Sequence, residues 1–129
     1  MEIGFWLFML FCELLIPFVM IVFGGIFSRK APGTINVWYG YRTALSMKNR
    51  DTWEFAHRYI GKLWVRLGWI TLIFSLLPLL LLFGKDVDTV GNASLVLTPI
   101  QLIIMVVPIF KTEAALKRTF DQSGRRRPT

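Results

Sequence analysis

The sequence predicts an all-α membrane protein with three transmembrane helices, an inner-face loop and interfacial helical segments. Of its 129 residues, 54% are hydrophobic and only 18% are charged. A water-soluble domain of this size could not bury so much apolar surface, so many of these side chains must face something other than water. Three runs approach the roughly 20 apolar residues that a helix needs to cross a bilayer. These predicted spans cover residues 4–27, 63–83 and 93–110 of a single integral membrane domain, 1–129.

The first span, residues 4–27, is expected to be retained as a helix and not removed as a signal peptide. Residues 1–3 carry no basic group, and the apolar run is longer than the hydrophobic region of a typical signal peptide. The cysteine in this span, Cys12, is the only one in the chain, so no intrachain disulfide is expected.

The basic residues predict the orientation of the chain in the cell membrane. Of the 15 Lys and Arg residues, eight lie between residues 28 and 66 and six follow the third span, whereas the connection 84–92 holds only Lys85. The positive-inside rule therefore predicts a cytoplasmic loop, 28–62, and a cytoplasmic basic tail, 111–129, with the N-terminus outside. We expect these charges to face anionic lipid headgroups and not nucleic acid.

The polar segment after the first span predicts a loop followed by a helix. Pro32 and Gly33 end the first helix, and the sequence DTWE at residues 51–54 predicts a helix start capped by Asp51. This helix is expected to continue into the second span. Three aromatic residues of the loop are expected at the lipid headgroup level: Trp38, Tyr39 and Tyr41. After the third span, we expect an interfacial helix and then a frayed tail at residues 125–129.

An ordered set of residues in this segment resembles the signature of the SdpI/YfhL family of small bacterial multi-pass membrane proteins. The resemblance covers residues 28–83 and rests on Asn36, Gly40, Tyr41, Arg42, Thr43, Ser46, Asn49, Trp53, Ala56 and Gly61. It implies a non-enzymatic immunity or resistance protein that protects against a toxic peptide. One longer member of the family also signals by holding a cytoplasmic repressor at the membrane. We expect this chain to resemble the shorter branch, without the additional N-terminal spans of the longer form, which favours immunity over signalling.

The same segment holds the predicted ligand- or partner-binding residues: Asn36, Gly40, Tyr41, Arg42, Thr43, Ser46, Asn49, Trp53 and Arg58. Arg42 can donate two hydrogen bonds to a phosphate or a carboxylate. Alternatively, Arg42 pairs with Asp51 or Glu54 and ties the loop to the second helix. Ser46, Asn49 and Trp53 are expected to fasten the loop to the helix start. The single histidine, His57, is expected to be solvated or to face the headgroups.

A second candidate site is an intramembrane polar layer of Glu13, Ser75 and Gln101. At 1.5 Å per residue, these side chains lie about 14, 12 and 12 Å from the outer ends of their spans. Pro17 cannot donate to the Glu13 carbonyl, which leaves that acceptor open. Two interpretations stay open: a proton- or cation-linked site or toxin contact, and a structural interhelical hydrogen bond.

Three classes of function are therefore compared. The leading class is an immunity protein, and the alternative is a small oligomeric proton- or cation-coupled transporter or channel subunit that uses Glu13. A membrane enzyme is the least favoured, because no nucleophile with its base, no metal site and no cofactor site is recognisable. The predicted partners are anionic lipids and either a toxic peptide or a cytoplasmic regulator. A homo-oligomer is also predicted through Gly24, Gly25, Gly61 and Gly68.

Overall fold

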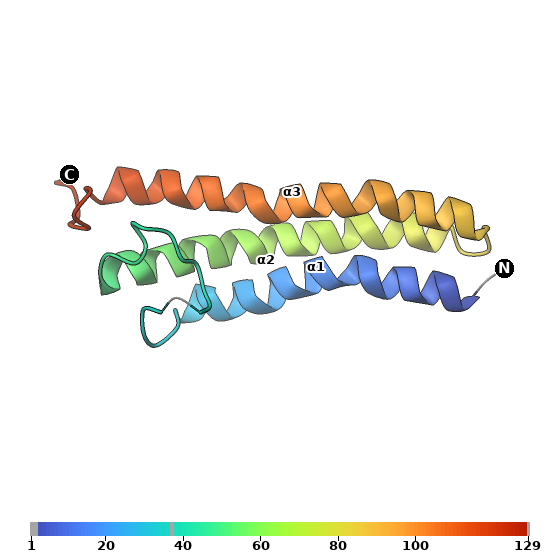
Figure 1. The fold of residues 1–129 in the computed structure, drawn as a ribbon, viewed down its shortest axis with the longest axis horizontal. Helices are drawn as coiled ribbons and strands as arrows, with labels where there is room; N and C mark the ends of the chain where they lie inside the picture. The colour runs from blue at the N-terminus through green and yellow to red at the C-terminus, as the bar shows by residue number, and fades with distance from the viewer. Residues whose placement is uncertain (1–2, 37, 129) are drawn as a thin grey trace.

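Three long helices lie side by side in the computed structural model, which describes residues 3–36 and 38–128. They are α1 (Ile3–Arg29), α2 (Arg50–Leu81) and α3 (Val87–Thr119). All three are long and apolar enough to cross a membrane. Figure 1 shows that the α1–α2 loop and the C-terminus lie at one end of the bundle, and the α2–α3 connection lies at the other. The predicted all-helical membrane fold is confirmed.

The second and third helices extend beyond the apolar runs that predicted them. α2 begins at Arg50, about three and a half turns before the span predicted at 63–83. α3 continues without a break to Thr119, so the predicted interfacial helical segment forms the last turns of the third helix. Because α2 and α3 both extend past the apolar runs at the loop end, they provide a platform on which the polar loop folds.

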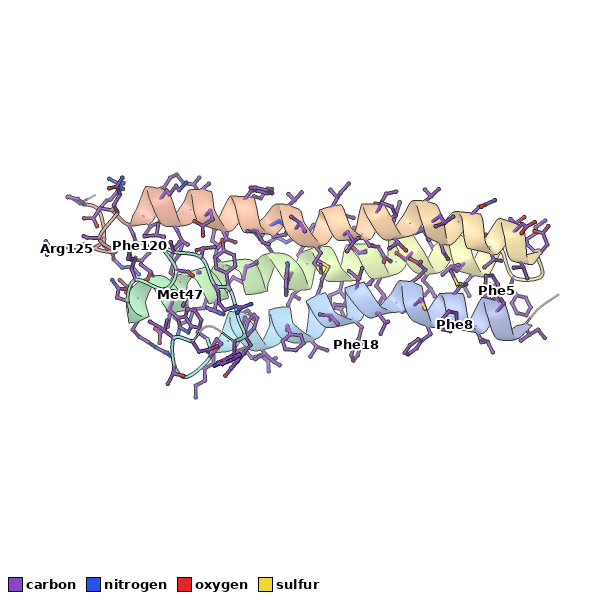
Figure 2. All side chains as sticks on the ribbon, in the orientation of Figure 1. Phe5, Phe8, Phe18, Met47, Phe120 and Arg125 are labelled. Atoms are coloured by element: carbon purple, nitrogen blue, oxygen red, sulfur yellow. The ribbon has the colours of Figure 1, made fainter. Side chains whose placement is uncertain are left out.

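The outer surface of the bundle is apolar, as a lipid solvent requires. Phe8 and Phe18 on α1 point away from the other helices (Figure 2) and are 60% and 62% exposed. The side chains turned inward include several polar ones, such as Thr71 and Thr112 at 0% exposure. Each of these two hydroxyls donates to the carbonyl four residues earlier in its own helix, at 2.7 Å.

Glycines allow α1 and α2 to pack closely within one chain. A Cβ atom on Gly24 would lie 2.8 Å from the Gly61 carbonyl oxygen, and one on Gly68 would lie 2.8 Å from Ile21. Gly24, Gly61 and Gly68 therefore serve this intrachain contact and are not free to form the predicted oligomer surface. The homo-oligomer itself stays a prediction. A Cβ atom on Gly25 would meet nothing within 4 Å.

The start of α2 differs by two residues from the predicted cap. Asn49 is the N-cap: its Oδ1 accepts from the Thr52 amide at 2.9 Å, while the Asn49 amide donates to Thr52 Oγ1 at 3.1 Å. This reciprocal arrangement satisfies two backbone donors at once. Asp51 therefore does not cap the helix, and its carboxylate pairs instead with Arg126 at 2.8 Å.

The C-terminal residues fold back along the end of α3, so the prediction of a frayed tail is wrong. Phe120 is fully buried, and the Arg127 amide donates to the Thr119 carbonyl at 2.8 Å. The Arg126 guanidinium lies 5.0 Å from the centre of the Phe120 ring. The tail is held by the buried ring of Phe120. The Arg126–Asp51 ion pair connects it to the start of α2.

Candidate functional site

Two side chains of α2 hold the beginning of the 30–49 loop against the helix. Trp53 is fully buried, and its Nε1 donates to the Pro32 carbonyl at 3.0 Å. Arg50 Nη1 donates to the Gly33 carbonyl at 2.8 Å. Both acceptors lie just after α1, where the chain leaves its helix and backbone carbonyls need new partners. The loop is thereby folded back onto α2.

His57 is the central fastener of the loop, and the prediction that it is solvated is wrong. It is fully buried, and its Nε2 accepts a hydrogen bond from the Tyr41 amide at 2.8 Å. Its Nδ1 lies 2.8 Å from the Trp53 carbonyl oxygen. Because Nε2 must be an acceptor and Nδ1 a donor, the imidazole is held neutral, in the Nδ1–H tautomer.

The hydrogen bond between the Tyr41 amide and His57 requires a glycine at position 40. Its φ of +104° lies in the region that side chains with a Cβ atom avoid. A Cβ atom at this position would also lie 2.6 Å from His57 Nε2. Glycine thus allows the loop backbone to reach the histidine.

Tyr41 points into the protein, whereas its two aromatic neighbours face outward. Tyr41 is 6% exposed, and its hydroxyl donates to Glu113 Oε1 at 2.8 Å. Burial, together with this carboxylate, raises the pKa of the Tyr41 hydroxyl, so the group stays protonated and remains a donor. Trp38 and Tyr39 are 84% and 56% exposed. The predicted headgroup position is therefore wrong for Tyr41.

Ser46 and Asn49 complete the internal bonding of the loop. Ser46 is fully buried; its Oγ donates to the Tyr41 carbonyl at 3.0 Å and accepts from the Thr43 amide at 2.9 Å. Asn49 Nδ2 donates to the Gly124 carbonyl at 2.8 Å, which joins the loop to the tail. Asn36 organises only its own turn, accepting from the Trp38 and Tyr39 amides at 2.9 and 2.8 Å.

Four of the predicted binding residues, Gly40–Thr43, form one wall of a pocket of about 350 Å³. All three helices supply the apolar walls, through Val19, Phe23, Phe27, Ile60, Trp64 and Ile109. Arg42 is an exposed residue of this lining. Arg58 lies apart, in a second hollow with Lys62 and Arg126. The nine predicted residues thus divide into a pocket wall, a set of fasteners and two outlying positions.

The two acids predicted as alternative partners of Arg42 pair with other arginines. Asp51 pairs with Arg126 of the tail, and Glu54 pairs with Arg50 at 2.9 Å. Both pairs are substantially exposed, so each contributes at most about 1 kcal/mol. Among the described residues, hydrogen bonds from Arg50, Trp53 and His57 fasten the loop to α2, and Asp51 and Glu54 form their ion pairs with Arg126 and Arg50.

The structure brings Glu13, Ser75 and Gln101 together between the helices. Gln101 Nε2 donates to the Glu13 carbonyl at 2.7 Å and to Ser75 Oγ at 2.6 Å. Thr98, which the sequence did not single out, donates to Glu13 Oε1 at 2.8 Å. Ser94 lies near the same carboxyl group, but Glu13 Oε2 and Ser94 Oγ are buried without a hydrogen bond of standard geometry.

These features define a small all-helical, multi-pass membrane protein whose polar loop is folded onto one end of a three-helix bundle. The chain belongs to the SdpI/YfhL protein family, whose model matches residues 34–112. This confirms the resemblance seen in the loop and extends it from residue 83 through most of α3. No curated protein and no solved structure gives a significant match.

Proposed function

We propose that this protein confers resistance to a toxic, membrane-active peptide by binding it without chemical conversion. Membership of the SdpI/YfhL family supports an immunity-type membrane protein. The observation that carries the finer proposal is the outer face of the loop, where Trp38, Tyr39 and Arg42 are all exposed. Trp, Tyr and Arg are the residue types that contribute most to binding at protein interfaces.

The fasteners beneath this face support the proposal. His57, Ser46 and Trp53 are each fully buried and each bonded to loop backbone. A loop fixed in this way loses little conformational entropy when a partner binds, which favours affinity. We propose that the loop lies at the cytoplasmic face, because the segments at this end of the bundle carry most of the basic residues. An inserting peptide would meet it after crossing the bilayer.

Survival of cells under peptide challenge tests this proposal. Cells that express the chain are exposed to a panel of amphipathic, membrane-disrupting peptides and compared with cells that express Trp38→Ala or Arg42→Ala. The matched controls are Trp69→Ala, which removes an indole 52% exposed on α2, and Arg118→Ala, which removes an exposed charge near the end of α3. The proposal predicts loss of protection only in the two loop variants. Equal protection by all four variants, at equal expression, overturns it.

The orientation requires its own measurement. Single cysteines are introduced at Trp38 and Lys85 in a Cys12→Ser background and labelled in intact cells with a membrane-impermeant maleimide. The proposed orientation predicts labelling at position 85 and none at position 38 until the cells are opened. The reverse result would place the loop outside the cell.

A second candidate function, a proton- or cation-coupled transporter, is favoured by one observation. Glu13 Oε2 and the nearby Ser94 Oγ are buried without a hydrogen bond of standard geometry, although such a bond is the rule for buried polar atoms. An acid inside a membrane span is a recurrent feature of ion pathways. Efflux driven by a proton gradient in reconstituted vesicles, lost in Glu13→Gln, would support this function. No efflux from vesicles that contain the native protein would reject it.

A further inference from the structure

We propose that the pocket behind the loop is a binding site for one anionic phospholipid, with an acyl chain between the helices and the phosphate at Arg42. The site shares Arg42 with the proposed resistance function, but its apolar walls lie behind the loop. Trp38, which is not part of the pocket lining, separates the two proposals, because Trp38→Ala should reduce protection without changing lipid binding. Its volume of about 350 Å³ lies within the range of pockets that bind small molecules.

The walls match an acyl chain in both composition and depth. α1 contributes Val19, Phe23 and Phe27 to the lining, and α2 contributes Ile60 and Trp64. From Val19 to Phe27 the lining extends about 12 Å along α1, at 1.5 Å per residue. A chain that enters at the loop end would therefore reach well into the apolar part of the bundle.

The polar groups in the walls are turned toward the protein. Trp64 Nε1 donates to the Met105 carbonyl at 3.1 Å. The Tyr41 hydroxyl donates to Glu113, and Tyr41 is almost completely buried. These bonds satisfy the indole N–H and the phenol and leave the aromatic surfaces to line the pocket. Such a surface suits hydrocarbon better than a polar peptide backbone, which would need hydrogen-bond partners.

The loop wall, in contrast to the apolar helix walls, supplies charged and polar side chains at the end where a headgroup would lie. Arg42 is exposed and lines the pocket together with Thr43. A guanidinium recognises phosphate by two parallel, charge-assisted hydrogen bonds. Charge complementarity therefore selects a phospholipid with net negative charge over a zwitterionic lipid, whose own cation would face Arg42. Basic groups at this end of the bundle, including Arg29 and Lys30, add to the attraction.

Native mass spectrometry of the purified full-length chain in detergent tests the site. Phosphatidylglycerol and phosphatidylcholine with identical acyl chains are titrated separately, and glycerol 3-phosphate is titrated as a soluble headgroup without chains. We expect one phosphatidylglycerol to bind about tenfold more tightly than phosphatidylcholine, equivalent to about 1.4 kcal/mol. Glycerol 3-phosphate should bind much more weakly, because it cannot fill the apolar walls.

Two pairs of variants locate the lipid. Arg42→Gln should remove the preference for phosphatidylglycerol, whereas Arg118→Gln, the same change at an exposed position outside the pocket lining, should keep it. Val19→Trp fills the pocket and should weaken the binding of both lipids. Val96→Trp, at a position 62% exposed on α3, should weaken the binding of neither. Circular dichroism checks that each variant keeps its helices.

Three outcomes would overturn the proposal. Equal affinity for the two lipids would remove the role of the phosphate. If Arg42→Gln and Arg118→Gln lose the preference for phosphatidylglycerol equally, the lipid is attracted by the basic end of the bundle as a whole and not by Arg42. A dimer that Val19→Trp dissociates would show that a second copy of the chain occupies the pocket. Because none of these results depends on peptide challenge, they leave the proposed resistance function untouched.

Discussion

Gln101 Nε2 lies 2.7 Å from the carbonyl oxygen of Glu13, the acceptor that Pro17 leaves without its usual helical donor. The same nitrogen donates to Ser75 Oγ at 2.6 Å, so one amide connects all three helices. Proline is tolerated in membrane helices where a neighbouring helix satisfies the carbonyl it leaves open. This relationship accounts for the glutamine in an otherwise apolar run. It does not account for the carboxyl group of Glu13.

The Glu13 carboxyl leads to the first prediction. Its Oε2 is buried without a hydrogen bond of standard geometry, as is Ser94 Oγ. Ser94 lies near this carboxyl group. In Glu13→Gln, an amide nitrogen at the Oε2 position can donate to Ser94, while the remaining oxygen still accepts from Thr98. We expect this variant to be as stable as the native protein or more stable by up to about 1 kcal/mol, measured as the free energy of unfolding in mixed micelles.

The matched control is Glu13→Leu, which removes the acceptor for Thr98 and should lower the free energy of unfolding. If Glu13→Gln is as damaging as Glu13→Leu, the carboxyl group itself, and not only its acceptor for Thr98, stabilises the bundle. If Glu13→Gln keeps both stability and cell protection, the acid has no ionisable role in resistance.

The contact between α1 and α2 gives the second prediction. In Gly61→Ala, the new Cβ atom would lie 2.7 Å from the Gly24 carbonyl oxygen and 2.9 Å from the Phe27 carbonyl carbon. Both neighbours are backbone atoms that cannot rotate away, so the helices must separate. We expect a loss of about 1–3 kcal/mol in the free energy of unfolding.

Gly25→Ala is the control for this change, because its Cβ atom would meet nothing within 4 Å. The native stability or a small gain is expected there, since alanine favours helix over glycine by up to about 1 kcal/mol. Equal losses at the two positions would contradict the close packing.

The third prediction concerns acid pH. An imidazolium carries hydrogen on both nitrogens and cannot accept from the Tyr41 amide. The folded loop therefore binds fewer protons than the open loop, so the stability that this bond contributes is present at neutral pH. It is lost as the pH falls below the ordinary histidine value of about 6.5. The protection factor of the Tyr41 amide, which is the intrinsic exchange rate divided by the observed rate at the same pH, should therefore fall between neutral pH and pH 5.

His57→Gln keeps a side-chain acceptor but cannot titrate. The protection factor of the Tyr41 amide in this variant should therefore not depend on pH. His57→Phe removes the acceptor and should exchange rapidly at both pH values. An acid response that persists in His57→Gln would assign the effect to another group.

The fourth prediction tests the folded tail. Phe120 is fully buried and packs edge-on against Phe55, with ring centroids 5.4 Å apart. Phe120→Ala should cost about 3 kcal/mol and release the Arg-rich tail. Trypsin should then cleave after Arg125 and Arg126 faster than in the native protein. Phe110→Ala is the control, because that ring is 69% exposed on α3. Unchanged cleavage in Phe120→Ala would contradict the anchor.

The sequence alone determined the helices and the family. Hydropathy is a local property, and the thickness of a bilayer fixes how long an apolar run must be. The spans could therefore be recognised without knowing which helix faces which. The order of polar residues from Asn36 to Gly61 identified the family, because a motif defined by residue order and spacing can be recognised without the tertiary structure.

The tertiary structure alone decided how the polar residues are paired. Tyr41 meets Glu113, 72 positions away, and Asn49 meets Gly124, 75 positions away. Such contacts depend on the rotation and axial register of whole helices, which no local pattern encodes. The burial of His57, the use of three glycines within one chain and the folded tail were missed for this reason. The Glu13 layer was the exception, because the bilayer gives each residue of a spanning helix a depth that can be counted along the sequence.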